Sequence, residues 1–216
     1  MNIPEEIENN YVDFISDTHL LKCISNLYNS YLSAKREFTK EEFYNNKVDI
    51  FKLTFDSKFN ELFEDELIKL EMSRQIDKSV NNAIGTFHKQ ILSGVNGIEL
   101  GHYGFDIKAI DNSLFAIFLF EEKFSNFEDV IFDKLARQAN IYKNSMCYLV
   151  DFNKTGITAE KWIVKPSQES SISHKQVFRI SADQFYTLIG KQENALSLLK
   201  SVSQNVILNL KNKTNC

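Results

Sequence analysis

The spacing of apolar residues predicts a largely helical first half. Apolar side chains recur every three to four residues in three stretches, which is typical of helices with one buried face. The stretches are Leu20 to Tyr31, Phe59 to Leu70, and Ile84 to Ile91. Most of the glycines then fall between residues 85 and 104, so residues 94–104 are expected to form a loop. We expect this loop to end the helical part and to open a sheet.

Strand patterns follow the loop. Residues 104–110 and 114–123 are predicted to form a hairpin, and the second strand is expected to be central because residues 114–120 are apolar on both faces. The later predicted elements are a helix over 127–143, strands over 146–152, 159–165 and 176–181, and a mainly helical end over 182–210. A strand–helix–strand unit after a hairpin predicts an α/β fold with a mixed β-sheet core flanked by helices. Without a linker-like segment, one domain is expected over 1–216, with a mainly helical part (1–92) and a sheet-containing part (93–216).

Composition narrows the class of protein. The chain has 216 residues and a net charge of −4, with 43% hydrophobic residues, which is ordinary for a globular protein and excludes disulfide scaffolds and disordered tails. Three scattered cysteines favour a reducing compartment, and no apolar run approaches the roughly 20 residues of a membrane span. We therefore expect a cytoplasmic protein with no membrane partner. Residues 1–71 are acidic and residues 72–216 slightly basic, which either arises by chance or reflects contact of the second part with a polyanion.

Charged side chains interrupt the apolar strands at one place. The central strand ends in Glu121-Glu122-Lys123, and a period of two puts Glu121 and Lys123 on one face. The predicted hairpin brings Asp106 beside Glu121. Two carboxylates that share Mg²⁺, with a lysine beside them, suit phosphodiester hydrolysis, because the metal lowers the pKa of a bound water and offsets phosphate charge. Solvated strand ends use the same residue types, so spacing alone leaves both interpretations open.

A longer motif precedes the glycines. Residues 73–90 contain the run Arg-Gln-x-Asp-Lys-Ser-x-Asn-Asn-x-Ile-Gly-x-Phe-His, with residues 52–59 upstream and Gly-Phe-Asp (104–106) downstream. Together they resemble a family of type II restriction endonucleases that is associated with the site GGNCC and carries a PD-(D/E)xK nuclease core. The similarity extends from near residue 15 to residue 151. It implies a restriction-endonuclease-like fold that hydrolyses both strands of duplex DNA in restriction-modification defence.

The resemblance also implies roles for individual residues. Asp106 is similar to the first metal ligand, and Glu121 and Lys123 are similar to the Glu-x-Lys pair, with Glu121 as the second ligand. Glu71 is a possible accessory acid on the preceding helix. The family further implies Mg²⁺ as cofactor, a cognate DNA methyltransferase as genetic partner and a homodimer. A dimer suits a near-palindromic duplex site, whose two scissile phosphates are related by a two-fold axis.

One part of the family pattern is missing. In the family, Glu-x-Lys is followed by Asn-Lys-His-Asn-Thr, and that run is absent here. If residues 114–116 align with the strand just before the catalytic Glu, then Ile117 and Leu119 occupy the catalytic positions. Glu121 and Lys123 then stand four residues further on, on the same strand face and about 13 Å away. The alternatives are an active enzyme with a displaced motif and a catalytically inactive, DNA-binding relative.

Residues of the helical part are further candidates for contact with DNA. Arg74, Lys78 and Lys89 suit phosphate contacts, and Asn82 and His88 suit base or backbone contacts. A structural role is the alternative for each: a solvated face for the basic residues, a helix cap for Asn82, and a hydrogen-bonded core position for His88. Later basic residues that suit guanine recognition are Lys165, Lys175 and Arg179.

Overall fold

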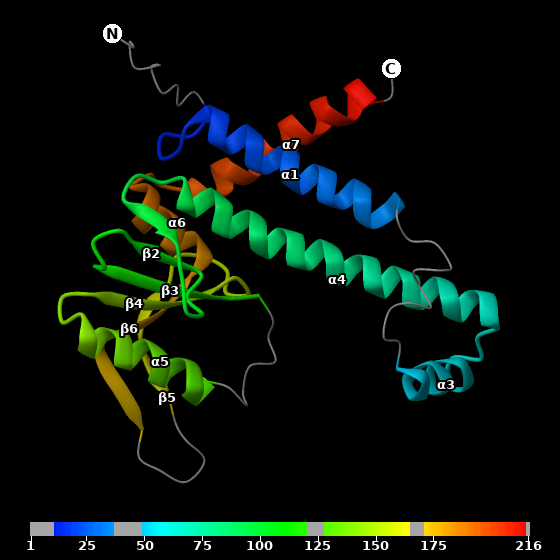
Figure 1. The fold of residues 1–216 in the computed structure, drawn as a ribbon, viewed down its shortest axis with the longest axis horizontal. Helices are drawn as coiled ribbons and strands as arrows, with labels where there is room; N and C mark the ends of the chain where they lie inside the picture. Colours follow the sequence, from blue (N-terminus) through cyan, green and yellow to red (C-terminus); the bar gives the residue numbers. More distant parts are fainter. Residues whose placement is uncertain (1–10, 37–48, 121–127, 165–170, 215–216) are drawn as a thin grey trace. The chain divides into compact units, whose positions relative to one another are not determined.

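The computed structural model describes residues 11–36, 49–120, 128–164 and 171–214 (Figure 1). Its helices are α1 (Asp17–Arg36), α3 (Ile50–Phe59), α4 (Glu64–Ser93), α5 (Glu128–Ile141), α6 (Ala182–Gly190) and α7 (Ala195–Thr214). Its strands are β1 (Ile98–Leu100), β2 (Ile107–Ala109), β3 (Leu114–Leu119), β4 (Met146–Asp151), β5 (Ala159–Val164) and β6 (Ile172–Ser181). Among these helices none has the length and apolar character that crossing a membrane requires.

The chain divides into two compact units. One unit contains residues 1–23 and 88–216, and the other contains residues 24–87. We call them the sheet unit and the helical unit. Helices α1 and α4 each contribute residues to both units.

The sheet unit is built on a six-stranded mixed sheet in the order β1-β2-β3-β4-β6-β5. Strands β1, β2 and β3 form an antiparallel meander, and β3, β4 and β6 run parallel. The edge strand β5 is antiparallel to β6. These pairings confirm the predicted mixed sheet, the hairpin and the interior position of β3. Helix α5 connects β3 to its parallel neighbour β4, as a crossover connection requires.

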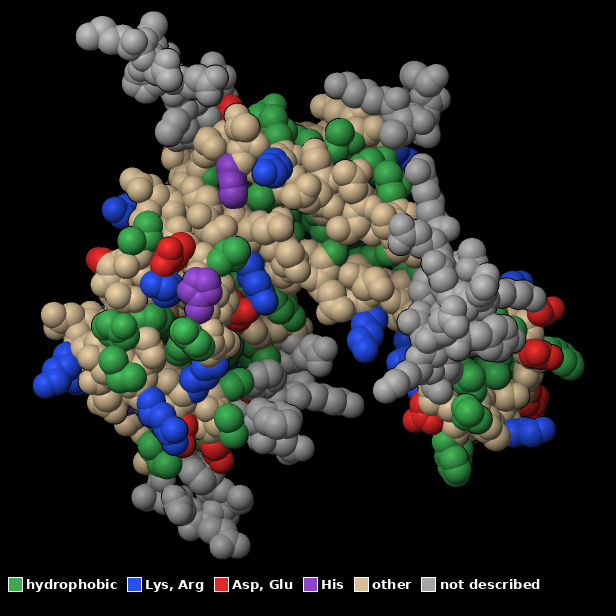
Figure 2. All heavy atoms as spheres, in the orientation of Figure 1, with side chains coloured by type: hydrophobic (Ala, Val, Ile, Leu, Met, Phe, Trp, Pro, Cys, Tyr) green, Lys and Arg blue, Asp and Glu red, His purple; other side chains and the backbone are tan. Residues whose placement is uncertain are grey.

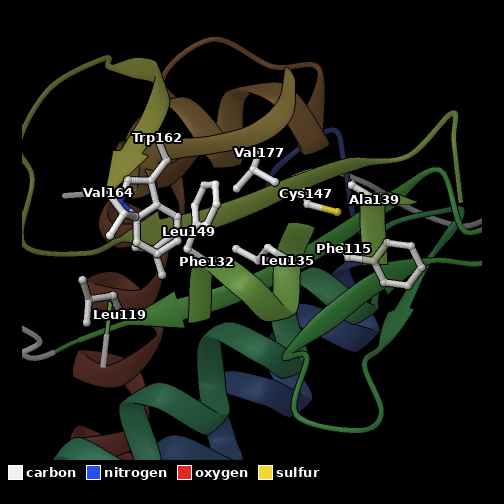
Figure 3. Close-up of a cluster of buried hydrophobic side chains, with 10 residues drawn as sticks. All are labelled: Phe115, Leu119, Phe132, Leu135, Ala139, Cys147, Leu149, Trp162, Val164 and Val177. Atoms are coloured by element: carbon white, nitrogen blue, oxygen red, sulfur yellow. The ribbon is translucent and has the colours of Figure 1, made fainter. Parts of the chain in front are cut away.

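Alternation along the strands supplies one apolar layer to each face of the sheet. Phe115 and Leu119 of β3 point to the α5 side, where they join the main hydrophobic cluster (Figure 3). Phe118 points to the opposite face and packs edge-on against Phe185 of α6, with ring centroids 6.2 Å apart. The buried members of the main cluster are Phe115, Leu119, Phe132, Leu135, Ala139, Cys147, Leu149, Trp162, Val164 and Val177. Both faces are therefore covered by helices, as the two-sided apolar runs predicted.

In the helical unit, the single predicted helix across residues 59–70 is wrong. The apolar period continues through this stretch, but α3 ends at Phe59 and α4 begins at Glu64. Glu61 adopts a left-handed backbone with φ of 53°, and the carboxylate of Glu66 accepts a hydrogen bond from the Phe63 amide at 3.0 Å. A capping interaction of this kind starts a new helix.

Three other boundaries differ from the predictions. Helix α4 continues through Asn82, so the interpretation of this residue as a helix cap is wrong. Strand β1 lies within the predicted loop 94–104, and β2 is shorter than predicted. The chain turns just before β2 because Gly104 has φ of +80°, a conformation that a glycine adopts without strain.

Candidate active site

Asp106 stands where the ladder between β2 and β3 ends. Its amide donates to the carbonyl of Ala116 at 2.9 Å, and its own carbonyl accepts from the amide of Gly101 at 3.0 Å. These two bonds hold its backbone one residue before β2. The side chain, of which only 18% is exposed, is thereby placed at the open end of the β2–β3 hairpin.

Both carboxylate oxygens of Asp106 have a donor. Oδ2 accepts a hydrogen bond from the Phe118 amide of β3 at 2.6 Å. Oδ1 lies 2.7 Å from the Nζ of Lys89, near the end of α4. The resemblance assigns a metal to Asp106, and the structure pairs this carboxylate with the Lys89 ammonium.

The residues of β3 beside Asp106 are apolar. Because Ile107 pairs with Ala116, Asp106 lies opposite Ile117 in the antiparallel register. Leu119, two residues further on, is buried in the main hydrophobic cluster. The sequence prediction that the hairpin brings Asp106 beside Glu121 concerns a residue beyond the described part of β3, so it stays a prediction. Glu121 and Lys123 themselves lie outside the described residues.

The chemistry of Asp106 fits one ligand of a divalent cation, since Mg²⁺ prefers carboxylate oxygens. Within the described ranges, no group of three or more His, Cys, Asp or Glu side chains is arranged to hold a metal ion. Ile117 and Leu119 carry no donor atom in their side chains. A complete magnesium site therefore needs ligands beyond those that the structure describes around Asp106.

The other predicted residues of α4 before residue 88 lie in the helical unit. Arg74, Lys78 and Asn82 are exposed and follow one another at intervals of four residues, so they share one face of the helix. Glu71 is buried, and its carboxylate accepts hydrogen bonds from Arg74 Nε at 2.7 Å and from Gln75 at 3.1 Å. The hydrogen bond from Arg74 is the main reason that the pKa of Glu71 is lowered. Glu71 is thus held as a carboxylate on α4.

His88 occupies a hydrogen-bonded core position, which is the structural role that the sequence analysis gave as the alternative to DNA contact. Its Nδ1 lies 2.8 Å from the hydroxyl of Tyr186, which is fully buried. Its ring packs against Phe152, with centroids 4.5 Å apart, and stacks on Phe120 at 5.9 Å. Burial lowers the pKa of His88 from 6.5 to about 4. The imidazole is therefore neutral at pH 7 and belongs to the aromatic layer between the sheet and α6.

The burial of His88 predicts a loss of stability in acid. Its folded pKa lies below its unfolded pKa, so protons bind the unfolded chain preferentially as the pH falls below 6.5, and the loss levels off below about pH 4. A shift of this size corresponds to roughly 3 kcal/mol in the free energy of unfolding. Urea denaturation between pH 7.5 and 4 is expected to show this loss in the wild type and a smaller one in His88→Gln. His102→Gln, at an exposed histidine, is the control and should keep the wild-type dependence. Equal pH dependence in His88→Gln and the wild type would contradict the assignment.

A hollow with two cationic side chains lies between α5 and the loop that precedes β2. Its volume is about 510 Å³, and it is lined by Lys134, Arg137 and the acidic Asp133 of α5 and by Tyr103 and Phe105 of the β1–β2 loop. Lys134 Nζ sits 5.0 Å from the centre of the Phe105 ring, and Tyr103 is 96% exposed. Sequence reasoning did not single out these residues. The available signal was the spacing of three between Lys134 and Arg137, which puts both on one face of a helix.

Arg179 is engaged by acids rather than free for guanine recognition. Its Nε and Nη2 donate to Asp151 Oδ2 at 3.0 and 2.6 Å, and its Nη1 lies 3.6 Å from Glu128. Burial raises the pKa of Asp151, but the hydrogen bonds from Arg179 and the Asn153 amide outweigh it, so the net pKa is lowered. This pair, whose carboxylate is buried and whose guanidinium is partly exposed, joins the carboxyl end of β4 to β6.

Comparison with known proteins identifies relatives of nearly the whole chain. Residues 12–215 match the family described as Eco47II restriction endonuclease. The type II restriction enzyme Sau96I of Staphylococcus aureus is 30% identical over 205 residues, which cover 88% of this chain and 77% of that enzyme. The family match includes both Lys89 and Asp106, so it covers the site as well as the helical motif.

Proposed function

Because the chain belongs to the Eco47II restriction endonuclease family, we propose that it is a site-specific deoxyribonuclease that hydrolyses both strands of duplex DNA at a short, GGNCC-like site in restriction-modification defence. The observation that carries this proposal is the position of Asp106, a carboxyl side chain held at the end of the β2–β3 hairpin with the Lys89 ammonium 2.7 Å from its Oδ1. The resemblance gives the residue at this position the role of first metal ligand. The relative Sau96I is itself a type II restriction enzyme.

The proposed cofactor is Mg²⁺, with Asp106 as one ligand and Glu121 as the second. Bound Mg²⁺ supplies a water of lowered pKa and offsets negative charge on the phosphate. Lys123 is the lysine that the sequence pattern implies for this site. Asp106, for its part, is oriented by the Phe118 amide on Oδ2, and its Oδ1 is the oxygen that lies beside the Lys89 ammonium.

A specific observation favours a second candidate, a catalytically inactive relative that binds DNA. Ile117 lies opposite Asp106, and Leu119 is buried in the core. These are the two positions where one alignment with the family places Glu and Lys. If Glu121 and Lys123 do not replace them, the chain keeps the fold and loses the chemistry.

Mapping of cleavage ends tests the proposed function. Purified protein is incubated with unmethylated plasmid DNA and Mg²⁺, and the ends of the products are sequenced. The proposal predicts that both strands are cut at every copy of one short sequence. Random nicks, or ends without a shared sequence, would contradict site-specific cleavage. DNA methylated at the deduced site serves as the control substrate and is expected to stay intact.

Contact with the DNA backbone is proposed for the hollow between α5 and the β1–β2 loop. On the face drawn in Figure 2, the Lys and Arg side chains of the sheet unit are interspersed with acidic ones instead of forming one basic patch. DNA binding is therefore assigned to particular lysine and arginine side chains instead of a continuous basic surface. Lys134 and Arg137, which line the hollow together with Phe105, are the proposed contacts on the sheet unit. On α4, Arg74, Lys78 and Asn82 remain proposed contacts.

Replacing both cations of the hollow is expected to weaken DNA binding at every sequence. The logarithm of the affinity falls with the logarithm of the salt concentration, and each phosphate contact contributes about 0.9 to the steepness of this fall. The double variant Lys134→Gln with Arg137→Gln should therefore make the fall shallower by about 2. Fluorescence anisotropy with a duplex in metal-free buffer, from 50 to 200 mM salt, measures this slope. Lys200→Gln, at an exposed residue of α7, is the control and should keep the wild-type slope. An unchanged slope in the double variant would exclude the hollow as a phosphate contact.

The proposed assembly is a homodimer, with a cognate DNA methyltransferase as genetic partner. A duplex site offers two equivalent phosphodiester bonds related by a two-fold axis, and two copies of one site match this symmetry. Sedimentation of the free protein and of its DNA complex tests the dimer. If one protein chain bound to a specific duplex cleaves both strands, the proposed homodimer is contradicted.

A further inference from the structure

The ammonium group beside Asp106 comes from a helix and not from the sheet. Lys89 Nζ of α4 lies 2.7 Å from Asp106 Oδ1, whereas β3 between Leu114 and Leu119 contains no lysine. We propose that Lys89 is an active-site lysine that acts on the scissile phosphate, a role that neither the strand motif nor the resemblance assigns. This inference rests on the proposed function.

Two other lysines near the β1–β2–β3 meander are engaged elsewhere. Lys108 of β2 lies 2.7 Å from Glu99 of β1 and 3.2 Å from the side-chain oxygen of Asn112. Lys134 of α5 sits over the ring of Phe105. Among the lysines that the structure describes around this meander, Lys89 is therefore the one paired with the Asp106 carboxylate.

Contacts of the neighbouring residues fix the direction of Lys89. His88 is bonded to the buried Tyr186 hydroxyl at 2.8 Å. The carbonyl of Gln90 lies 2.8 Å from Nε2 of His19 in the first turn of α1. Both contacts lie within the sheet unit, so the last turns of α4 have a set rotation about the helix axis. The side chain of Lys89 is still 38% exposed, which leaves its ammonium accessible to a phosphate that approaches Asp106.

This placement suits stabilisation of charge on the phosphate. During hydrolysis, the water oxygen forms a new bond to phosphorus and the bond from phosphorus to the leaving sugar oxygen breaks. The water loses its proton to solvent, and the leaving oxygen takes a proton from solvent. Lys89 donates hydrogen bonds to a non-bridging phosphate oxygen, where negative charge increases in the transition state.

Charge removal at Lys89 tests the role. Single-turnover cleavage of plasmid DNA is measured for the wild type, Lys89→Gln and Lys89→Arg, with Lys200→Gln as the control. Lys89→Gln is expected to cleave about 100-fold more slowly, and Lys89→Arg, which keeps the charge, should cleave faster than Lys89→Gln. Affinity for duplex DNA in metal-free buffer and thermal unfolding are measured in parallel. Both should change little, because the role concerns the transition state.

The outcomes separate this role from the proposed function. Cleavage by Lys89→Gln at the wild-type rate would overturn the role of Lys89 and leave the nuclease intact. A slow Lys89→Gln variant that Lys89→Arg does not improve, with a matching loss of thermal stability, would also overturn it and indicate a structural contact. Absence of cleavage by the wild type would reject the proposed function and this role with it.

Discussion

Asp106→Asn is expected to lower the rate of DNA cleavage by about 1000-fold. The amide keeps the size of the side chain and an oxygen that accepts from the Phe118 amide, but it removes the negative charge. Without that charge the site cannot attract the proposed Mg²⁺ ion. Single-turnover cleavage with excess protein over plasmid measures the rate, and anisotropy in metal-free buffer checks that the variant still binds duplex DNA.

Asp111→Asn is the matched control for this substitution. Asp111 lies in the turn between β2 and β3, where its side chain accepts from the Ser113 amide at 2.9 Å. Asparagine makes the same turn interaction, so the control should cleave at the wild-type rate. If Asp106→Asn and Asp111→Asn cleave equally fast, Asp106 is not a metal ligand and the active site lies elsewhere in the chain.

Arg179→Met is expected to cost roughly 3–5 kcal/mol in the free energy of unfolding. The substitution keeps much of the side-chain length but leaves the buried carboxylate of Asp151 without its two hydrogen bonds from the guanidinium. Removal of one partner from a buried ion pair is costly because the remaining charge has lost its solvation and its counter-ion. Urea denaturation at pH 7 measures the loss.

Lys154→Met is the control, because it breaks an ion pair at the surface. Lys154 pairs with Glu160, whose side chain is 60% exposed, and such pairs contribute at most about 1 kcal/mol. The prediction is therefore a clear difference between the two variants. Similar small losses in both would show that Arg179 is not needed to neutralise Asp151.

The elements that the sequence predicted best are those whose apolar pattern matches their burial. Strands β3 and β4 are apolar on both faces and lie inside the sheet between covering helices. Helix α5 was predicted from its apolar residues at helical spacing, and the face that carries them packs on β4 and β6. The break between α3 and α4 was missed because the apolar spacing continues across it. The chain leaves the helix where Glu61 adopts a left-handed backbone conformation.

The site was only partly predictable for a different reason. Asp106 was identified from its motif and predicted within a strand over 104–110, whereas the structure places it one residue before β2. The contact between Asp106 and Lys89 was not predicted, because periodicity within an element shows which residues share a face but not which face meets another element. Likewise, the register of β2 and β3 decides that Ile117 is the neighbour of Asp106.

The most direct test of the account is incubation of the wild-type protein with unmethylated plasmid DNA, with and without Mg²⁺. The account predicts discrete double-strand fragments that appear with Mg²⁺ and are absent when the metal is chelated. Intact plasmid at all Mg²⁺ concentrations, with salt-sensitive DNA binding retained, would contradict it and identify the chain as an inactive DNA-binding member of its family.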